Sequence, residues 1–150
     1  TMNALFSKYT FCFYPKHGYV PIMKANIVKH NFKIKKKGKS LNLKAFEVIH
    51  GMIKANGFLF NKVAYISDCN KIPKKSLKNL YNLNFLVLDC LRRNKHPSHF
   101  NYDEALELIK VVRPKKTILT NLHTDFDYFN LKRKLPKNII PAYDGLSFKF

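Results

Sequence analysis

The sequence lacks the features that mark membrane proteins and disulfide-rich proteins. No apolar run approaches the roughly 20 residues of a membrane span, and no signal-peptide pattern is seen. Three cysteines without a CxxC pair exclude a disulfide framework and a zinc ribbon, which use even, clustered cysteines. We therefore expect a reducing, cytoplasmic setting and no membrane partner, with Cys69 and Cys90 as small, partly buried filling residues.

Acidic residues and arginines are scarce, whereas lysine is abundant. The chain has 28 basic and 9 acidic residues and a formal net charge of +19, which by itself indicates a polyanionic partner such as nucleic acid. However, most of the charge is lysine spread along the chain, and phosphate recognition favours arginine. The densest run, residues 33–39, is typical of an exposed hairpin or loop. We interpret it as solvated, with nucleic acid as the less favoured partner.

Strands that alternate with helices from residue 63 onward predict an α/β layered domain. At 150 residues the chain is long enough for one domain. A tight hairpin at Asn61-Lys62, a helix cap at Asn101 and a turn at Asp144-Gly145 divide the elements. The predicted strands cover residues 41–49, 57–60, 63–67, 85–88, 117–120 and two segments within 139–150, and the predicted helices cover residues 73–80, 102–112 and 127–135.

Polar side chains follow the ends of four buried-looking strands. These residues are His50, Asp68, Asp89 and, after a short turn, His123. Ligands bind at the carboxyl ends of strands in α/β sheets, and a buried aspartate without a partner costs several kcal/mol. Taken singly, a strand-end aspartate is more often a turn residue and a histidine more often a core residue. Together they favour a metal site for an ion such as Zn²⁺ or Mn²⁺, or an acid/base site.

A second group of polar residues lies in the loop after residue 89. His96 and His99 are three residues apart and follow Arg92 and Arg93. Such a loop suits a proton donor or a phosphate contact at the mouth of a site. A surface loop in which His99 caps the next helix fits the spacing equally well. Arg92 suits an anionic substrate, or merely keeps the loop solvated.

The motifs follow one another in a recognisable order along nearly the whole chain. They are VIHG at 48–51, AYISD at 64–68, FLVLD at 85–89, HPSHF at 96–100, ILTNLHTDFDY at 118–128 and PAYDG at 141–145. This succession resembles the metallo-β-lactamase-fold hydrolases, and within them the phosphoribosyl 1,2-cyclic phosphate phosphodiesterase-like group. The resemblance implies the C-terminal portion of an αββα sandwich, with mixed sheets flanked by helices.

The resemblance also implies roles for individual residues. His50 matches a metal ligand, Asp68 matches the carboxylate that bridges two divalent ions, zinc or manganese, and His123 matches the last ligand. Many relatives place that last histidine where this chain has Asn121, so the choice between His123 and Asn121 stays open. His99 matches the proton donor of the family.

Three more residues complete the predicted site. Asp89 is expected to orient a site residue from behind. His96 and Arg92 are expected to contact the substrate. In such a site two metal ions would activate a hydroxide for attack on a phosphodiester, and His99 would protonate the leaving oxygen.

One hallmark of the family is missing, the His-x-His-x-Asp-His motif that supplies further ligands. We therefore expect residues 1–150 to be one partial domain that binds metal poorly and turns over little by itself. The full-length protein is expected to be a cytoplasmic, metal-dependent phosphodiesterase for a small cyclic or ribose-linked phosphate ester, with a homodimer as the default state. The alternatives are a tRNA 3′-processing endonuclease of the same superfamily and an inactive nucleic-acid-binding fragment.

Overall fold

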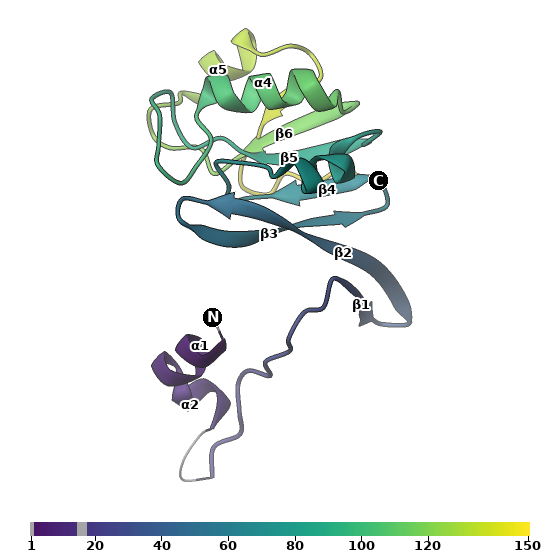
Figure 1. The fold of residues 1–150 in the computed structure, drawn as a ribbon, viewed down its shortest axis with the longest axis vertical. Coiled ribbons are helices and arrows are strands. Elements are labelled where there is room, and N and C mark those ends of the chain that lie inside the picture. The colour runs from purple at the N-terminus through teal and green to yellow at the C-terminus, as the bar shows by residue number, and fades with distance from the viewer. Residues whose placement is uncertain (1, 15–17) are drawn as a thin grey trace.

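A computed structural model describes residues 2–14 and 18–150 of the chain. Its centre is one mixed sheet, in which the strands lie in sequence order (Figure 1). The first four strands pair antiparallel and the last four pair parallel. The strands are β1 (Asn31–Lys36), β2 (Lys39–His50), β3 (Ile53–Phe60), β4 (Val63–Ile66), β5 (Phe85–Asp89), β6 (Lys116–Thr120) and β7 (Ile139–Pro141). The predicted α/β class is confirmed.

Two tight turns shape the antiparallel half of the sheet. Lys37 and Gly38 join β1 to β2 with φ of 48° and 76°, and Asn61 and Lys62 join β3 to β4 with φ of 43° and 62°. Two successive residues with positive φ match the twist of the flanking strands. The hairpin predicted at Asn61-Lys62 is confirmed, and the lysine-rich run is a hairpin rather than a loop.

Helices connect the parallel strands. A short helix α3 (Lys74–Leu77) and a 3₁₀ turn η1 (Lys78–Leu80) follow β4, α4 (Tyr102–Val112) follows β5, and α5 (Tyr128–Lys134) follows β6. Asn101 begins α4 as predicted: its side chain accepts a hydrogen bond from the backbone N–H of Glu104, whose carboxylate accepts from the N–H of Asn101. Arg113, in the left-handed conformation, ends that helix.

The helices pack on one face of the sheet and form the core with it. Phe46, Ile66, Leu88 and Leu119 of the sheet lie in one buried cluster that also includes residues of α4 and α5. Gly57 of β3 leaves room for the Phe46 ring, because a Cβ there would lie 2.5 Å from the ring. This packing holds the strand ends in place.

The C-terminal residues depart from the prediction. Asp144 and Gly145 form the expected turn, but residues 146–150 form no strand. Instead the Phe148 ring stacks on Phe85 at 4.7 Å, and the Phe150 ring meets Phe60 at 5.2 Å. The predicted second strand of this segment is therefore wrong, because the aromatic side chains pack on neighbouring strands and residues 146–150 pair with none.

The N-terminal segment lies apart from the sheet. Helices α1 (Met2–Lys8) and α2 (Thr10–Phe13) lie at a distance from the strands, and an extended stretch leads from them to β1 (Figure 1). In the described residues, none of the helices has the length and apolar character needed to cross a membrane.

Candidate metal centre

The carboxyl ends of β2, β4, β5 and β6 meet at the same edge of the sheet. β2 and β4 are both antiparallel to β3, so they run in one direction, and β5 and β6 are parallel to β4. His50 ends β2, Asp89 ends β5, and Asp68 lies two residues beyond β4. The strand order thus brings together side chains that are up to 39 residues apart (89 − 50).

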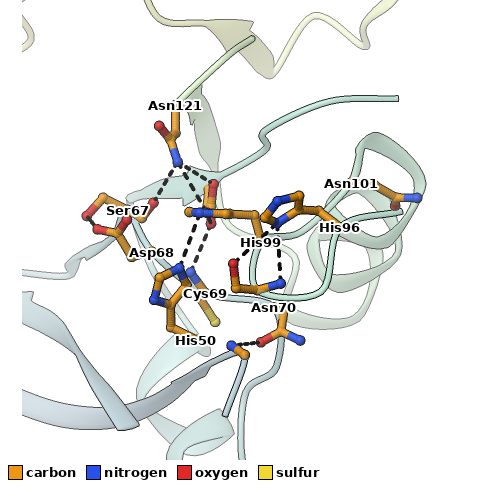
Figure 2. Close-up of polar contacts among 12 residues, drawn as sticks. His50, Ser67, Asp68, Cys69, Asn70, His96, His99, Asn101 and Asn121 are labelled. Atoms are coloured by element: carbon orange, nitrogen blue, oxygen red, sulfur yellow. Dashed lines mark hydrogen bonds and ion pairs between the residues drawn. The ribbon is translucent and has the colours of Figure 1, made fainter. Parts of the chain in front are cut away.

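Three of the predicted residues form a compact group. One ligand atom each from His50, Asp68 and His99 lie within 4.8 Å of one another. The Nε2 atoms of His50 and His99 are 3.2 Å apart, and Figure 2 shows both rings turned toward each other. Asp68 is exposed and accepts a hydrogen bond from the Ser67 hydroxyl at 2.8 Å. Two imidazoles and a carboxylate therefore share one small volume.

Asp89 anchors this group from inside the protein. Its side chain is fully buried and accepts hydrogen bonds from the backbone N–H of Cys69 at 2.9 Å, from His99 Nδ1 at 2.6 Å and from Asn121 Nδ2 at 3.2 Å. Burial raises the pKa of the Asp89 carboxyl, and the hydrogen bond from Cys69 is the largest effect that opposes the rise. The hydrogen bond from Nδ1 to the Asp89 carboxylate orients the His99 ring so that its Nε2 faces His50.

Asn70 is a site residue that the sequence did not indicate. Its Oδ1 accepts from the backbone N–H of Gly51 at 2.9 Å (Figure 2), and its Nδ2 donates to the carbonyl of Pro97 at 3.0 Å. Asn70 thus ties the turn after His50 to the loop that carries His99. An asparagine in a turn is common, so the sequence alone carried no signal for this role.

His123 lies outside the compact group. Its Nδ1 contacts the Asp125 carboxylate, which lowers the pKa of that carboxyl, and its side chain is 54% exposed. Asn121 is the residue after β6 that reaches the group: it has φ of 63° and points its Nδ2 toward Asp89 and the carbonyl of Ser67. The pairing with Asp125 leaves Nε2 of His123 available as a ligand, the arrangement that carboxylates commonly impose on metal-binding histidines.

The loop with His96 and Arg92 borders the group. The His96 ring lies 5.0 Å from the His99 ring, and the backbone N–H of Ser98 approaches its Nδ1 at 3.3 Å. Desolvation, reinforced by the positive charge of Arg92, lowers the pKa of His96. The Arg92 guanidinium donates to the carbonyls of Asn94 and Lys95, at 3.3 and 2.9 Å, so it also shapes this loop.

The two cysteines near the site are structural. Cys69 and Cys90 are fully buried, and burial raises the pKa of each thiol to about 12. Both therefore remain protonated at neutral pH and are poor metal ligands. The sequence-based interpretation of both as filling residues is confirmed.

The donor set suits a divalent metal ion of intermediate softness. Imidazole nitrogen and carboxylate oxygen are the ligands that zinc and manganese accept. His50 and Asp68 offer an imidazole nitrogen and an exposed carboxylate oxygen within 4.8 Å of each other, so these two residues fit a metal ion.

The chain belongs to the β-lactamase superfamily domain family, whose sequence model matches residues 1–121. A crystal structure of a new diphosphatase from the PhnP family matches with 28% identity and a TM-score of 0.86, over 100% of this chain and 55% of that chain. The metallo-β-lactamase fold protein YhfI from Bacillus subtilis matches with 15% identity and a TM-score of 0.68, over 96% of this chain and 61% of that one. The metallo-β-lactamase fold is thereby confirmed.

Two further matches were found. The short form of human tRNase Z is 17% identical with a TM-score of 0.57, over 78% of this chain and 46% of that chain. A protein from Porphyromonas gingivalis named octanoyltransferase is 27% identical over 109 residues, which are 71% of this chain and 22% of that protein. The chain thus spans little more than half of the diphosphatase and less than a quarter of the octanoyltransferase.

Proposed function

We propose that the intact protein containing this chain is a metal-dependent phosphodiesterase for a small cyclic or ribose-linked phosphate ester. The observation that carries the proposal is the convergence of His50, Asp68 and His99 within 4.8 Å, with Asp89 behind His99. The similarity to a diphosphatase of the PhnP family supports phosphate-ester chemistry. Residues 1–150 would form one partial domain, and the His-x-His-x-Asp-His segment would precede them in the intact protein.

In this proposal His50, Asp68 and His123 bind two divalent ions, zinc or manganese. When bound, such ions polarise the phosphate oxygens and supply a hydroxide at neutral pH. His123 would bind through Nε2 while Asp125 holds Nδ1, and Asp68 would bridge the two ions through its exposed carboxylate. The protein would act in the cytoplasm, with a homodimer as the default state.

His99 is the proposed proton donor to the leaving oxygen. Asp89 holds its Nδ1, which directs Nε2 toward the group formed with His50 and Asp68. A carboxylate behind the ring stabilises the protonated imidazole, which favours proton pick-up at Nε2. His96 and Arg92 would contact the substrate phosphate at the mouth of the site, since their loop borders His99.

The second candidate is a tRNA 3′-processing endonuclease. The chain shares its fold with human tRNase Z, and its net charge of +19 would suit an RNA substrate. At 17% identity that similarity concerns the fold alone, so the small phosphate ester remains the first choice. A third candidate, an inactive nucleic-acid-binding protein, would leave the histidines without a metal.

Three measurements on the intact protein test these candidates. Hydrolysis of a cyclic ribose phosphate in the presence of Mn²⁺ or Zn²⁺, lost in the His99→Ala variant, is the expected result. Cleavage of precursor tRNA without hydrolysis of the small ester would reject the first proposal in favour of the second.

Metal content that is unchanged in His50→Ala and Asp68→Ala would reject the proposed site. The Asp103→Ala variant, altered in the first turn of α4, is the matched control.

A further inference from the structure

A lysine-lined groove lies at the edge of the sheet opposite the candidate metal centre. Two neighbouring hollows share Lys44, Leu59 and Lys62, and their volumes are about 600 and 500 Å³. Lys33 lines the first hollow and Lys78 the second. We call this surface the basic groove and define it by its four lysines, Lys33, Lys44, Lys62 and Lys78.

The strand register places two of the groove lysines, Lys33 and Lys44, on one face of the sheet. Asn31 pairs with Lys44 and Lys33 pairs with Asn42, so these four side chains point to the same side of the β1–β2 hairpin. Amide groups alternate with the lysines along the groove, and the ring of Tyr81, 47% exposed, lines its far end. The groove therefore combines positive charge, hydrogen-bonding amides and an accessible aromatic ring.

Charge of the opposite sign is missing from this part of the chain. Neither hollow has an Asp or Glu among its described lining residues. In the sequence, no acidic residue precedes Glu47. Glu47 itself is engaged by Lys54 and Lys75, at 2.9 and 3.0 Å, outside the groove. None of the four groove lysines has an ion pair with another described residue, so all four can meet anions from solution.

The β1–β2 hairpin extends this positive surface away from the body of the protein (Figure 1). The exposed residues 35–39 at its tip include four lysines, Lys35, Lys36, Lys37 and Lys39. At about 3.3 Å per residue, the 12 residues of β2 separate the tip from His50 by roughly 36 Å. A ligand of the hairpin and groove therefore need not touch the metal centre.

We propose that the basic groove binds the sugar–phosphate backbone of a single-stranded nucleic acid. Lysines spaced along a concave surface match successive phosphates, and their contacts give the largest part of such affinity. The exposed Tyr81 ring offers a surface on which an unpaired base can stack. A base inside a duplex is already stacked between its neighbours and cannot use this surface. The inference goes beyond the proposed phosphodiesterase function and does not depend on it.

The test measures binding of a fluorescein-labelled 20-nucleotide single strand by anisotropy, with RNA and DNA in separate arms. The intact protein is compared with a variant in which Lys33, Lys44, Lys62 and Lys78 are all replaced by Gln. We expect this variant to bind at least about tenfold more weakly, and the slope of log K against log salt to fall by about 3 units, since each phosphate contact contributes about 0.7. The nucleic acid that binds with the higher affinity, RNA or DNA, is then the ligand that the groove prefers.

A control variant with the same loss of charge replaces four exposed lysines outside the groove, Lys110, Lys132, Lys134 and Lys137. It should keep affinity within about twofold of the parent, because distant surface charges are screened. Equal losses in the two variants would overturn the proposal, since they would show only general attraction. Absence of binding by the parent protein at low salt, or preference for a duplex, would also overturn it. Circular dichroism establishes that each variant is folded.

The aromatic ring gives a second, independent readout. Tyr81→Leu removes the stacking platform but no charge, so affinity should fall by about fivefold or more while the salt slope stays constant. Tyr143→Leu, at a tyrosine outside the groove that is 55% exposed, is its control. Hydrolysis of the small phosphate ester should survive all of these groove substitutions. Failure of the binding test therefore leaves the proposed enzyme function untouched, and failure of the hydrolysis test leaves the groove proposal standing.

Discussion

The two ends of the same sheet carry polar residues in opposite ways. At the carboxyl edge, Asp89 is fully buried and accepts hydrogen bonds from three partners, one of which is His99. At the opposite edge, Lys33, Lys62 and Lys78 are exposed. At the carboxyl edge, connected hydrogen bonds fix the orientation of each side chain. At the opposite edge, the lysines are separate charges whose effects add.

This contrast has a physical consequence. A buried network fails when one member is removed, because the remaining donors or acceptors lose their partners in a region that water does not reach. Exposed charges can be removed singly at little cost, because water replaces each contact. Substitutions at the carboxyl edge should therefore have large and coupled effects, and substitutions in the basic groove small and additive ones.

The largest effect is expected for Asp89→Ala. The change leaves the N–H of Cys69, the Nδ1–H of His99 and the amide of Asn121 without their acceptor, so the free energy of unfolding should fall by about 3 kcal/mol. Urea unfolding of the intact protein measures it. Asp103→Ala, exposed in the first turn of α4, should cost less than about 1 kcal/mol. Equal losses for the two variants would erase the contrast between buried and exposed acids.

The next effect separates His123 from Asn121 at the metal centre. If His123 supplies the last ligand, His123→Ala should lower metal affinity by more than about 100-fold, and Asn121→Ala, which acts through its contacts with Asp89 and the Ser67 carbonyl, by about tenfold. Competition with a chromogenic chelator in the intact protein measures both affinities. The reverse order would transfer the ligand role to Asn121, which lies at the group in this structure.

A smaller effect is expected for single substitutions in the basic groove. Lys78→Gln removes one of several phosphate contacts, so affinity for a single strand should fall about threefold and the salt slope by about 0.7. Anisotropy titration at several salt concentrations measures both quantities. Lys110→Gln on α4 should change neither. A loss of more than tenfold from Lys78→Gln alone would show that the groove lysines also act as a connected network.

The smallest effect concerns Glu47, whose pKa is lowered first by its hydrogen bonds with Lys54 and Lys75. A lowered pKa in the folded state adds stability above the ordinary value of 4.5, and this stability disappears as pH falls through the folded-state pKa. Glu47→Gln should therefore lower the Tm slightly at pH 7 and leave it unchanged in strong acid. Exposed Glu107, which has no ion pair among the described residues, is the control; a pH-independent difference for Glu47→Gln would contradict this assignment.

Much of the fold could be predicted because local signals and burial agree. The capping pattern at Asn101 and the buried strand 85–88 are such cases, since each element contains the reason for its own boundaries. The C-terminal segment 146–150 could not be predicted in the same way. Its alternating aromatic residues are typical of a strand, but their packing against Phe60 and Phe85 depends on surfaces far away in the chain.

The candidate site divides along the same line. The strand-end positions of His50, Asp68 and Asp89 were visible in the sequence, because hydrophobic runs end at polar residues there. The link that Asn70 makes between Gly51 and Pro97 could not be predicted from the sequence, since it joins two separate loops. The choice between Asn121 and His123 also depends on loop geometry, which sequence spacing does not specify.

By itself, the sequence determined the order of strands and helices and the residues that end each strand, because periodicity and turn chemistry act over short distances. It also determined the excess of lysine. Only the tertiary structure decided which strand-end residues meet, that Asp89 orients the ring of His99, and that Lys33, Lys44, Lys62 and Lys78 share one groove. The reason is that sheet pairing brings together residues far apart in the chain. The local sequence pattern does not specify which of these residues come into contact.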